Sequence, residues 1–170
     1  MAEALPMGTT LFQQGNMTVV PSRIRDIFIL ENRLRDADRE EIWASHHQSA
    51  KQALMVGFRN SAPCFTVEVN GSPIAMFGAV PVECDSAAVA WLLGTDDIRK
   101  NWQAFLRLSR QCVQNLLEKY EFLYNHVGAW NTESIDWLKW CGAELDEPQA
   151  YGIERREFRR FSIKRGDPHV

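Results

Sequence analysis

The chain has 170 residues, of which 45% are hydrophobic and 24% charged, and a formal net charge of -3. This length suits one domain with a sizeable core and is too short for two ordinary domains. The negative net charge excludes a global basic field that would recruit nucleic acid, so contact with DNA is not favoured. No run approaches the ~20 apolar residues that span a bilayer, and no signal peptide is apparent. We therefore expect a chain made in the cytoplasm, with no membrane partner.

The cysteine and histidine patterns do not predict a metal or disulfide framework. The cysteines are widely spaced and contain no CxxC pair, so we expect reduced, mostly buried thiols. His46 and His47 are adjacent, and neighbouring side chains on a helix point about 100° apart. That geometry places the pair poorly for chelating one ion, and no metal site is predicted. The cysteines are Cys64, Cys84, Cys112 and Cys141.

The first half of the chain predicts a strand, three helices and a hairpin. Residues 1–16 show no sustained period and contain Gly8 and Gly15, so they are expected to be an N-terminal extension. Asp38 is expected to cap the second helix, with Glu41 three residues on. Asn70-Gly71 is the strongest short-range hairpin signal in the chain. The expected elements are a strand over 17–20, helices over 22–34, 36–45 and 49–58, and strands over 63–69 and 73–80.

The second half predicts a central strand followed by helices and a final hairpin. Residues 87–93 are apolar nearly throughout, as in a central strand. A long amphipathic helix is expected over 98–120, a strand over 122–127, a helix over 132–141 and a hairpin of 143–145 with 157–163. Residues 166–170 are expected to be a tail, which leaves one domain over 17–165. The order predicts an α/β (α+β) fold, with a mixed, mostly antiparallel sheet flanked by helices on both faces.

The stretch from Asn131 to Leu145 resembles a motif of the GNAT acetyltransferases. Many GNAT domains carry, after the fifth strand, an Asn, then Ala or Ser three residues on, then Leu-Tyr and Gly-Phe. Here the matching positions are Asn131, Ser134, Trp137, Leu138 and Gly142. The resemblance implies a GNAT-like fold.

A narrower resemblance covers about the last third of the chain. The segments LEKY, NT-x-x-I-x-x-L-K-x-x-GA and F-x-I-K-R-G are similar to the small internal virion proteins of Autographivirus-type podoviruses. That family is thought to share a degenerate GNAT-like core. The resemblance implies a bacteriophage protein that is made in the host cytoplasm and later joins the virion or an assembly intermediate.

The loop that would hold a cofactor departs from the GNAT pattern. A GNAT enzyme normally holds the pyrophosphate of acetyl-CoA with Q/R-x-x-G-x-G/A, whose glycines let backbone N–H groups approach the anion. The corresponding stretch here is LLGTDDIRKNW, with Gly94 as its only glycine. Thr95 or Asp96 is expected to cap the next helix, and Asp96 and Asp97 add negative charge where phosphates would sit. At ~4 Å, like charges cost about 4 kcal/mol at an effective dielectric near 20. Gly94, Thr95 and Asn131 remain as weak cofactor-binding candidates.

The proton donor of the family pattern is also missing. The Tyr that would protonate the departing thiolate is replaced by Leu138, which cannot donate a proton. Tyr124 lies on a predicted strand and could face a cleft, whereas Tyr120 and Tyr151 lie elsewhere in the pattern. Glu83 is a candidate base, but a loop carboxylate of this kind is more often simply solvated. We therefore predict no catalytic residues.

Basic and aromatic residues supply candidates for a partner surface. The ordinary interpretation of the C-terminal arginines is a charged edge strand that discourages aggregation. The functional interpretation is a docking patch for an acidic protein partner, with Phe161 and Ile163 packed inward and Arg160 outward. The partner-binding candidates are Arg155, Arg156, Arg159, Arg160, Trp43 and Trp140.

These observations favour a non-catalytic, virion-associated structural protein on a degenerate acetyltransferase scaffold. Its expected partners are phage structural proteins such as portal, tail or core proteins, and it would need no cofactor. A homo-oligomer or ring is an open alternative. Two other functions also stay open. One is an active N-acetyltransferase using acetyl-CoA, and the other is a phage regulator that binds a host protein.

Overall fold

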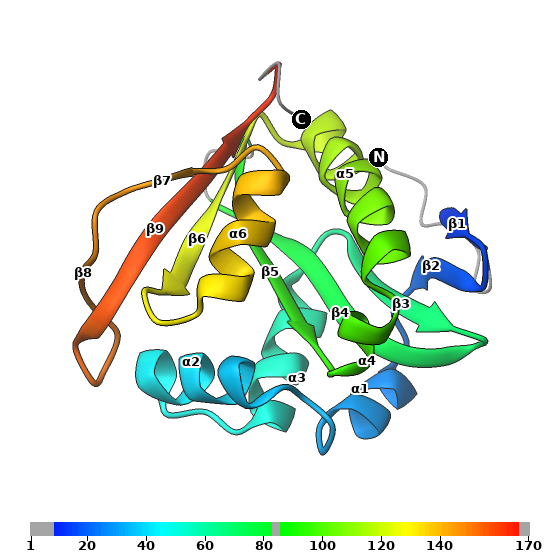
Figure 1. The fold of residues 1–170 in the computed structure, drawn as a ribbon, viewed down its shortest axis with the longest axis horizontal. Coiled ribbons are helices and arrows are strands. Elements are labelled where there is room, and N and C mark those ends of the chain that lie inside the picture. The colour runs from blue at the N-terminus through cyan, green and yellow to red at the C-terminus, as the bar shows by residue number, and fades with distance from the viewer. Residues whose placement is uncertain (1–8, 83–85, 167–170) are drawn as a thin grey trace.

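The computed structural model describes residues 9–82 and 86–166, so Glu83 and Cys84 lie outside the described residues. Its centre is one nine-stranded sheet in the order β1-β2-β3-β4-β5-β6-β9-β7, with β8 also paired to β9 (Figure 1). The strands are β1 (Phe12–Gln14), β2 (Met17–Pro21), β3 (Cys64–Val69), β4 (Ser72–Pro81), β5 (Ala87–Gly94), β6 (Phe122–Gly128), β7 (Glu144–Leu145), β8 (Gln149–Tyr151) and β9 (Arg156–Lys164). The helices are α1 (Ile24–Leu30), α2 (Asp36–His46), α3 (Ala50–Asn60), α4 (Asp97–Lys100), α5 (Trp102–Lys119) and α6 (Thr132–Trp140).

The predicted fold class is confirmed. Neighbouring strands of the sheet are antiparallel except for β5 and β6, which run parallel. The connection between those two strands is α5, as a parallel pair requires a crossover. The Asn70-Gly71 turn joins β3 to β4 as expected, with both residues at positive φ.

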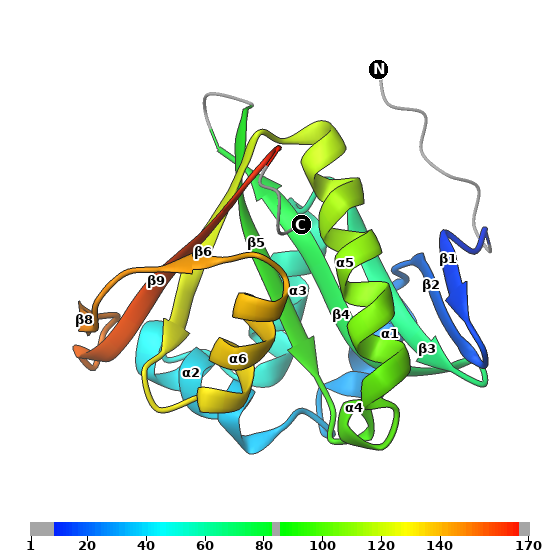
Figure 2. The same cartoon turned by 45° about the horizontal axis from the view of Figure 1, so that its top comes forward.

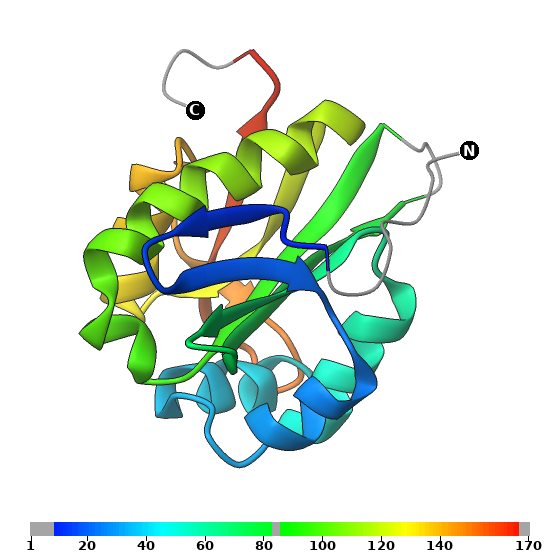
Figure 3. The ribbon, with the colours of Figure 1, turned by 90° about the vertical axis from the view of Figure 1, so that its right-hand side faces the viewer.

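The sheet begins earlier in the chain than the sequence predicted. Phe12–Gln14 forms β1, which pairs with β2 through a tight turn at Gly15, where φ is +62°. Figure 3 shows this hairpin lying beside α5. Phe12 packs against the main core, so part of the expected extension belongs to the domain. The alternation of this strand is too short to stand out in the sequence.

Two predicted helices are shorter than expected. The first ends at Leu30 rather than at residue 34. The long helix over 98–120 is broken into α4 and α5 at Asn101, whose φ of -120° and ψ of 26° are not helical. The Asn101 amide donates to the Asp97 carbonyl at 2.9 Å, and such local bonds compete with a continuous helix.

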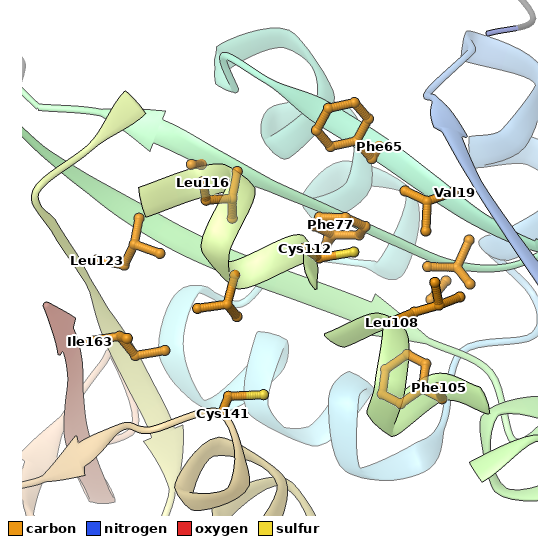
Figure 4. Packing of buried hydrophobic residues seen from close by; sticks show 14 of the residues in the cluster. Val19, Phe65, Phe77, Phe105, Leu108, Cys112, Leu116, Leu123, Cys141 and Ile163 are labelled. Carbon is orange, nitrogen blue, oxygen red and sulfur yellow. The ribbon is translucent and has the colours of Figure 1, made fainter. Parts of the chain in front are cut away.

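Helices cover both faces of the sheet, as predicted. On one face α5 and α6 cover the larger core, in which Phe105, Leu108 and Leu116 of α5 meet strand residues such as Phe77 and Leu123 (Figure 4). On the other face α1, α2 and α3 bury a smaller cluster around Leu30, Leu54 and Met76.

Cysteines contribute to both of these packed layers. Cys112 and Cys141 are buried in the larger core, and burial raises the pKa of each thiol to about 12. Cys64 is half-buried beside the smaller cluster. All three are free thiols in this structure, and Cys84 lies outside the described residues.

The C-terminal strand is an interior strand, and its predicted place at the edge of the sheet is wrong. β9 pairs with β6 on one side and with β7 and β8 on the other. The sequence missed β8 because three residues beside Pro148 carry little strand signal. The predicted pairing with 143–145 is confirmed by the partners Leu145 and Phe161, and Phe161 and Ile163 are buried as expected.

We predict that the turn between β8 and β9 depends on Gly152. Its φ is +76°, and an added β-carbon would lie 2.5 Å from Ser45 Cα, a backbone atom of α2 that cannot easily move. Gly152→Ala should therefore lower the free energy of unfolding by about 2–4 kcal/mol. Gly71→Ala is the matched control, because φ there is also +76° but nothing lies within 4 Å. It should cost only about 1 kcal/mol from backbone strain. Equal losses in urea unfolding would show that the hairpin does not pack tightly on α2.

Candidate functional site

The candidate site lies where β5 and β6 separate. The two strands pair only over Ala87–Val89 and Phe122–Tyr124. They then diverge, as Figure 2 shows. At the branch point the Asn125 amide donates to the Ala90 carbonyl at 2.9 Å. Beyond it lies a cleft of about 300 Å³ between the sheet and α2 and α3.

Polar groups enter this cleft from several elements of the fold. α2 contributes Asp38 and Glu41, β6 contributes Asn125 and His126, and Tyr151 comes from β8. The apolar wall includes Trp91, Trp137 and Phe158. The cleft is therefore assembled from segments that lie far apart in the sequence.

Glu41 bridges α2 and the end of β6. Its Oε1 accepts hydrogen bonds from the Gly128 backbone N–H and from the Asn131 amide, each at 2.8 Å. It has no ion-pair partner among the described residues. Burial, only partly offset by these hydrogen bonds, raises the pKa of Glu41 to about 7.

Asp38 joins α2 to the end of β5. Its carboxylate accepts a hydrogen bond from the Gly94 backbone N–H at 2.8 Å and pairs with Arg35 at 2.7 Å. Burial raises the pKa of Asp38, against the opposing effect of Arg35. The prediction that Asp38 caps α2 is wrong, because Arg35 is at the N-cap and makes no side-chain cap bond. Asp38 and Glu41 face the sheet instead, which their spacing alone did not indicate.

His126 and Tyr151 form a stacked pair on one side of the cleft. Their ring centroids lie 3.8 Å apart with an interplanar angle of 10°. Burial, assisted by the nearby Arg160, lowers the pKa of His126, and burial raises the pKa of Tyr151. Tyr124 lies beneath the Arg160 guanidinium, 4.9 Å from the ring centroid. Tyr120 is buried and donates its hydroxyl to the Ala62 carbonyl.

The far end of β5 is closed by side chains of the same chain. A β-carbon added to Gly94 would lie 2.3 Å from Ile98 Cδ1, so Ile98 fills the space that the glycine leaves. Thr95 is buried, and its hydroxyl accepts a hydrogen bond from the Asp97 N–H at 3.3 Å, but the N-cap position of α4 is Asp96 and not Thr95. Asp96 makes no side-chain cap bond.

The residues of the motif after β6 have structural contacts. Asn131 caps α6 by accepting from the Ser134 N–H at 3.3 Å, while its amide is held by Glu41. Leu138 is buried with Val127, Ile135 and Phe161. The position of the expected tyrosine is therefore occupied by an apolar core residue.

Solved acetyltransferases share this architecture. Spermidine N-acetyltransferase from Vibrio cholerae, in complex with CoA and spermine, superposes with a TM-score of 0.67 at 14% identity, covering 91% of this chain and 98% of that one. The ribosomal-protein-S18-alanine N-acetyltransferase of Escherichia coli gives 0.64 at 16%, covering 87% and 93%. The chain has the GNAT fold. At these identities the similarity establishes the fold alone, and no protein-family profile matches the sequence.

A sequence relative comes from a bacteriophage. The probable scaffold protein gp13 of Escherichia phage T7 is 28% identical over 139 residues, which cover 78% of this chain and 94% of that protein. The aligned region is thus nearly the whole of the T7 protein. This similarity agrees with the resemblance of the C-terminal segments to phage virion proteins.

The residues at the end of β5, where the sequence placed the phosphate loop, are occupied by contacts within the chain. The Ile98 side chain fills the space beside Gly94, and the Gly94 N–H donates a hydrogen bond to Asp38. Between α4, α5 and α6 there remains a cavity of only about 10 Å³, and one water needs about 10–15 Å³. Gly94, Thr95 and Asn131, the cofactor candidates, all make contacts within the chain.

The arginine candidates do not form one continuous basic patch. Arg156 pairs with Glu40 at 2.7 Å and stacks on Trp130 at 3.7 Å. Arg159 donates to the Asp146 carbonyl at 2.7 Å, and Arg160 lies over Tyr124. Arg155 is exposed and has no ion pair among the described residues.

The tryptophan candidates lie on different sides of the sheet. Trp43 on α2 is 54% exposed and stacks on His47, which lies 3.4 Å from Glu154 in the β8–β9 turn. Trp140 on α6 is 44% exposed, with the Arg110 guanidinium 3.9 Å from its ring. The structure thus brings Trp43 close to the turn that carries Arg155, and it separates them from Trp140. A binding role for these residues stays a prediction.

Other functional classes receive no support from the described residues. Within residues 9–82 and 86–166 no group of three or more His, Cys, Asp or Glu side chains could hold a metal ion. No helix in the same part of the chain is long and apolar enough to cross a membrane.

We predict that Glu41 makes the folded chain less stable as pH rises. Its pKa is about 7 in the folded state against an ordinary 4.5, so the folded state holds the proton more tightly. The stabilisation is complete below about pH 4.5 and is lost as pH rises through 7. Unfolding free energies should fall by about 2 kcal/mol between pH 5 and 8, less than the full shift implies because Glu41 keeps some solvent contact.

Glu41→Gln should remove most of this pH dependence, because the amide oxygen can still accept both hydrogen bonds. Glu118→Gln is the control, since Glu118 is exposed and makes no ion pair with described residues. Urea unfolding at both pH values measures the effect. An unchanged pH slope in Glu41→Gln would show that Glu41 titrates normally.

Proposed function

We propose that the chain is a non-catalytic structural protein of a phage particle, built on a degenerate acetyltransferase scaffold. The similarity to the probable scaffold protein of phage T7 is the observation that carries this proposal, because it spans nearly all of that protein. Loss of the proton donor at Leu138 and of the phosphate loop at Gly94 supports a role without acetyl transfer. The partners would be phage structural proteins such as portal, tail or core proteins.

An active N-acetyltransferase is the second candidate. The observation that favours an enzyme is the open cleft of about 300 Å³, which has the ionisable side chains Glu41 and Tyr151 on its walls. Its chemistry would require a proton donor other than position 138. Thermal melting with acetyl-CoA distinguishes the two, since a ligand at 100 times its Kd stabilises a folded protein by about 2.7 kcal/mol.

We predict that the chain copurifies with phage assemblies. In infected cells, a tagged copy should sediment with particles or assembly intermediates and be captured together with portal, tail or core proteins. A soluble phage enzyme of similar size, tagged in the same way, is the control. A chain that stays with the slowly sedimenting proteins throughout infection and captures no phage protein would contradict the structural role. Capture of a host protein alone would favour the regulator instead.

Docking is predicted at the end of the molecule that carries Trp43 and Arg155. Trp and Arg are among the residue types that most often dominate binding energy. Trp43 is largely exposed, and Arg155 makes no ion pair with the residues that the structure describes. Trp43→Ala with Arg155→Glu should leave the melting temperature nearly unchanged and weaken partner capture at least about tenfold.

Trp140→Ala is the matched variant on the other side of the sheet, where Arg110 already covers the ring. It should capture the partner normally. The reverse pattern, with loss only in Trp140→Ala, would move the docking surface to α6.

A further inference from the structure

Basic side chains gather on the surface where α4 follows β5. Arg33 comes from the segment after α1, while Arg99 and Lys100 belong to α4. Three cations from two segments would ordinarily attract a multiply charged anion such as a pyrophosphate.

Each of these cations forms an ion pair with a carboxylate of the same chain. Asp97 accepts a hydrogen bond from Arg33 and pairs with Lys100 at 2.8 Å. The hydrogen bond from Lys100 is the main reason that the pKa of Asp97 is lowered. Asp97 thus receives two cations on one carboxylate, as a phosphate group would.

Arg99 is held by a second carboxylate from a distant part of the chain. Its guanidinium donates to Glu133 at 2.7 and 3.1 Å and to Asp96 at 3.0 Å. Glu133 lies in the first turn of α6, so this contact joins α4 to α6. The hydrogen bonds from Arg99 lower the pKa of Glu133, which stays ionised.

We infer that these carboxylates act as an internal substitute for a bound pyrophosphate and close an anion site that Arg33, Arg99 and Lys100 would otherwise form. The acids both neutralise the three cations and tie the surrounding elements together. The wild-type chain therefore rejects pyrophosphate-bearing ligands, including acetyl-CoA. This inference goes beyond the proposed role in assembly and does not depend on it.

The test removes the two carboxylates that hold the cations and leaves the cations in place. Asp97→Asn with Glu133→Gln keeps the size and shape of both side chains and should unmask Arg33, Arg99 and Lys100. The matched control is Glu118→Gln with Asp136→Asn, which changes the net charge equally at exposed residues without ion pairs in the described structure. Because exposed ion pairs contribute little to stability, both variants should melt close to the wild type.

Isothermal titration with inorganic pyrophosphate, and then with CoA, measures the result. The Asp97→Asn, Glu133→Gln variant should bind pyrophosphate at least about tenfold more tightly than the control and the wild type, and added salt should weaken that binding. Equal affinity in the variant and the control would overturn the inference, as would tight binding by the wild type. If pyrophosphate binds the variant and CoA does not, the site is an anion site whose nucleotide groove is blocked elsewhere, which supports the inference. Capture of phage proteins by the wild type tests the proposed function separately.

Discussion

The structure depends on the way in which the gap between β5 and β6 is closed. Parallel strands that diverge leave backbone N–H and C=O groups without ladder partners, and such groups must be satisfied by something else. Here the chain uses its own polar side chains. Asn125 meets Ala90 at the branch point, Asp38 meets Gly94 at the far end, and Glu41 meets Gly128 on the opposite strand. The helix α2 is therefore fixed to both arms of the opening.

This closure fits the proposed role, in which the scaffold is kept without acetyl transfer. In a cofactor-binding site, backbone donors must remain available for a ligand, and the glycines that expose them weaken the local structure. In this chain Ile98 occupies the space at Gly94, and Asp38 takes the nearest backbone donor. The interactions that a ligand would supply are instead permanent parts of the fold. Such a rigid block is suited to presenting side chains such as Trp43 to another protein.

This arrangement places two carboxylates, Asp38 and Glu41, in buried surroundings that disfavour their charged forms. Asp38 is balanced by Arg35, whereas Glu41 has only neutral donors, so its charge is stabilised less well. The two acids lie on the same helix, but only Asp38 has a charged partner. Asp97 on α4 and Glu133 on α6 behave in the opposite way, since hydrogen bonds from Lys100 and Arg99 lower their pKa values.

The sequence by itself determined the order of most elements, the hairpin at Asn70-Gly71 and the apolar faces of β9 and α5. These features follow from local periodicity and turn chemistry, which neighbouring residues carry. It also identified Leu138 as unable to act as an acid, since that conclusion needs only the side chain. What tertiary structure decided were the contacts between distant segments. Asp38 and Glu41 have the spacing of a capping box, and only the packing of α2 across the sheet turns them toward β5 and β6. The interior position of β9 likewise depended on β8, whose three residues pair only because β9 already provides an edge.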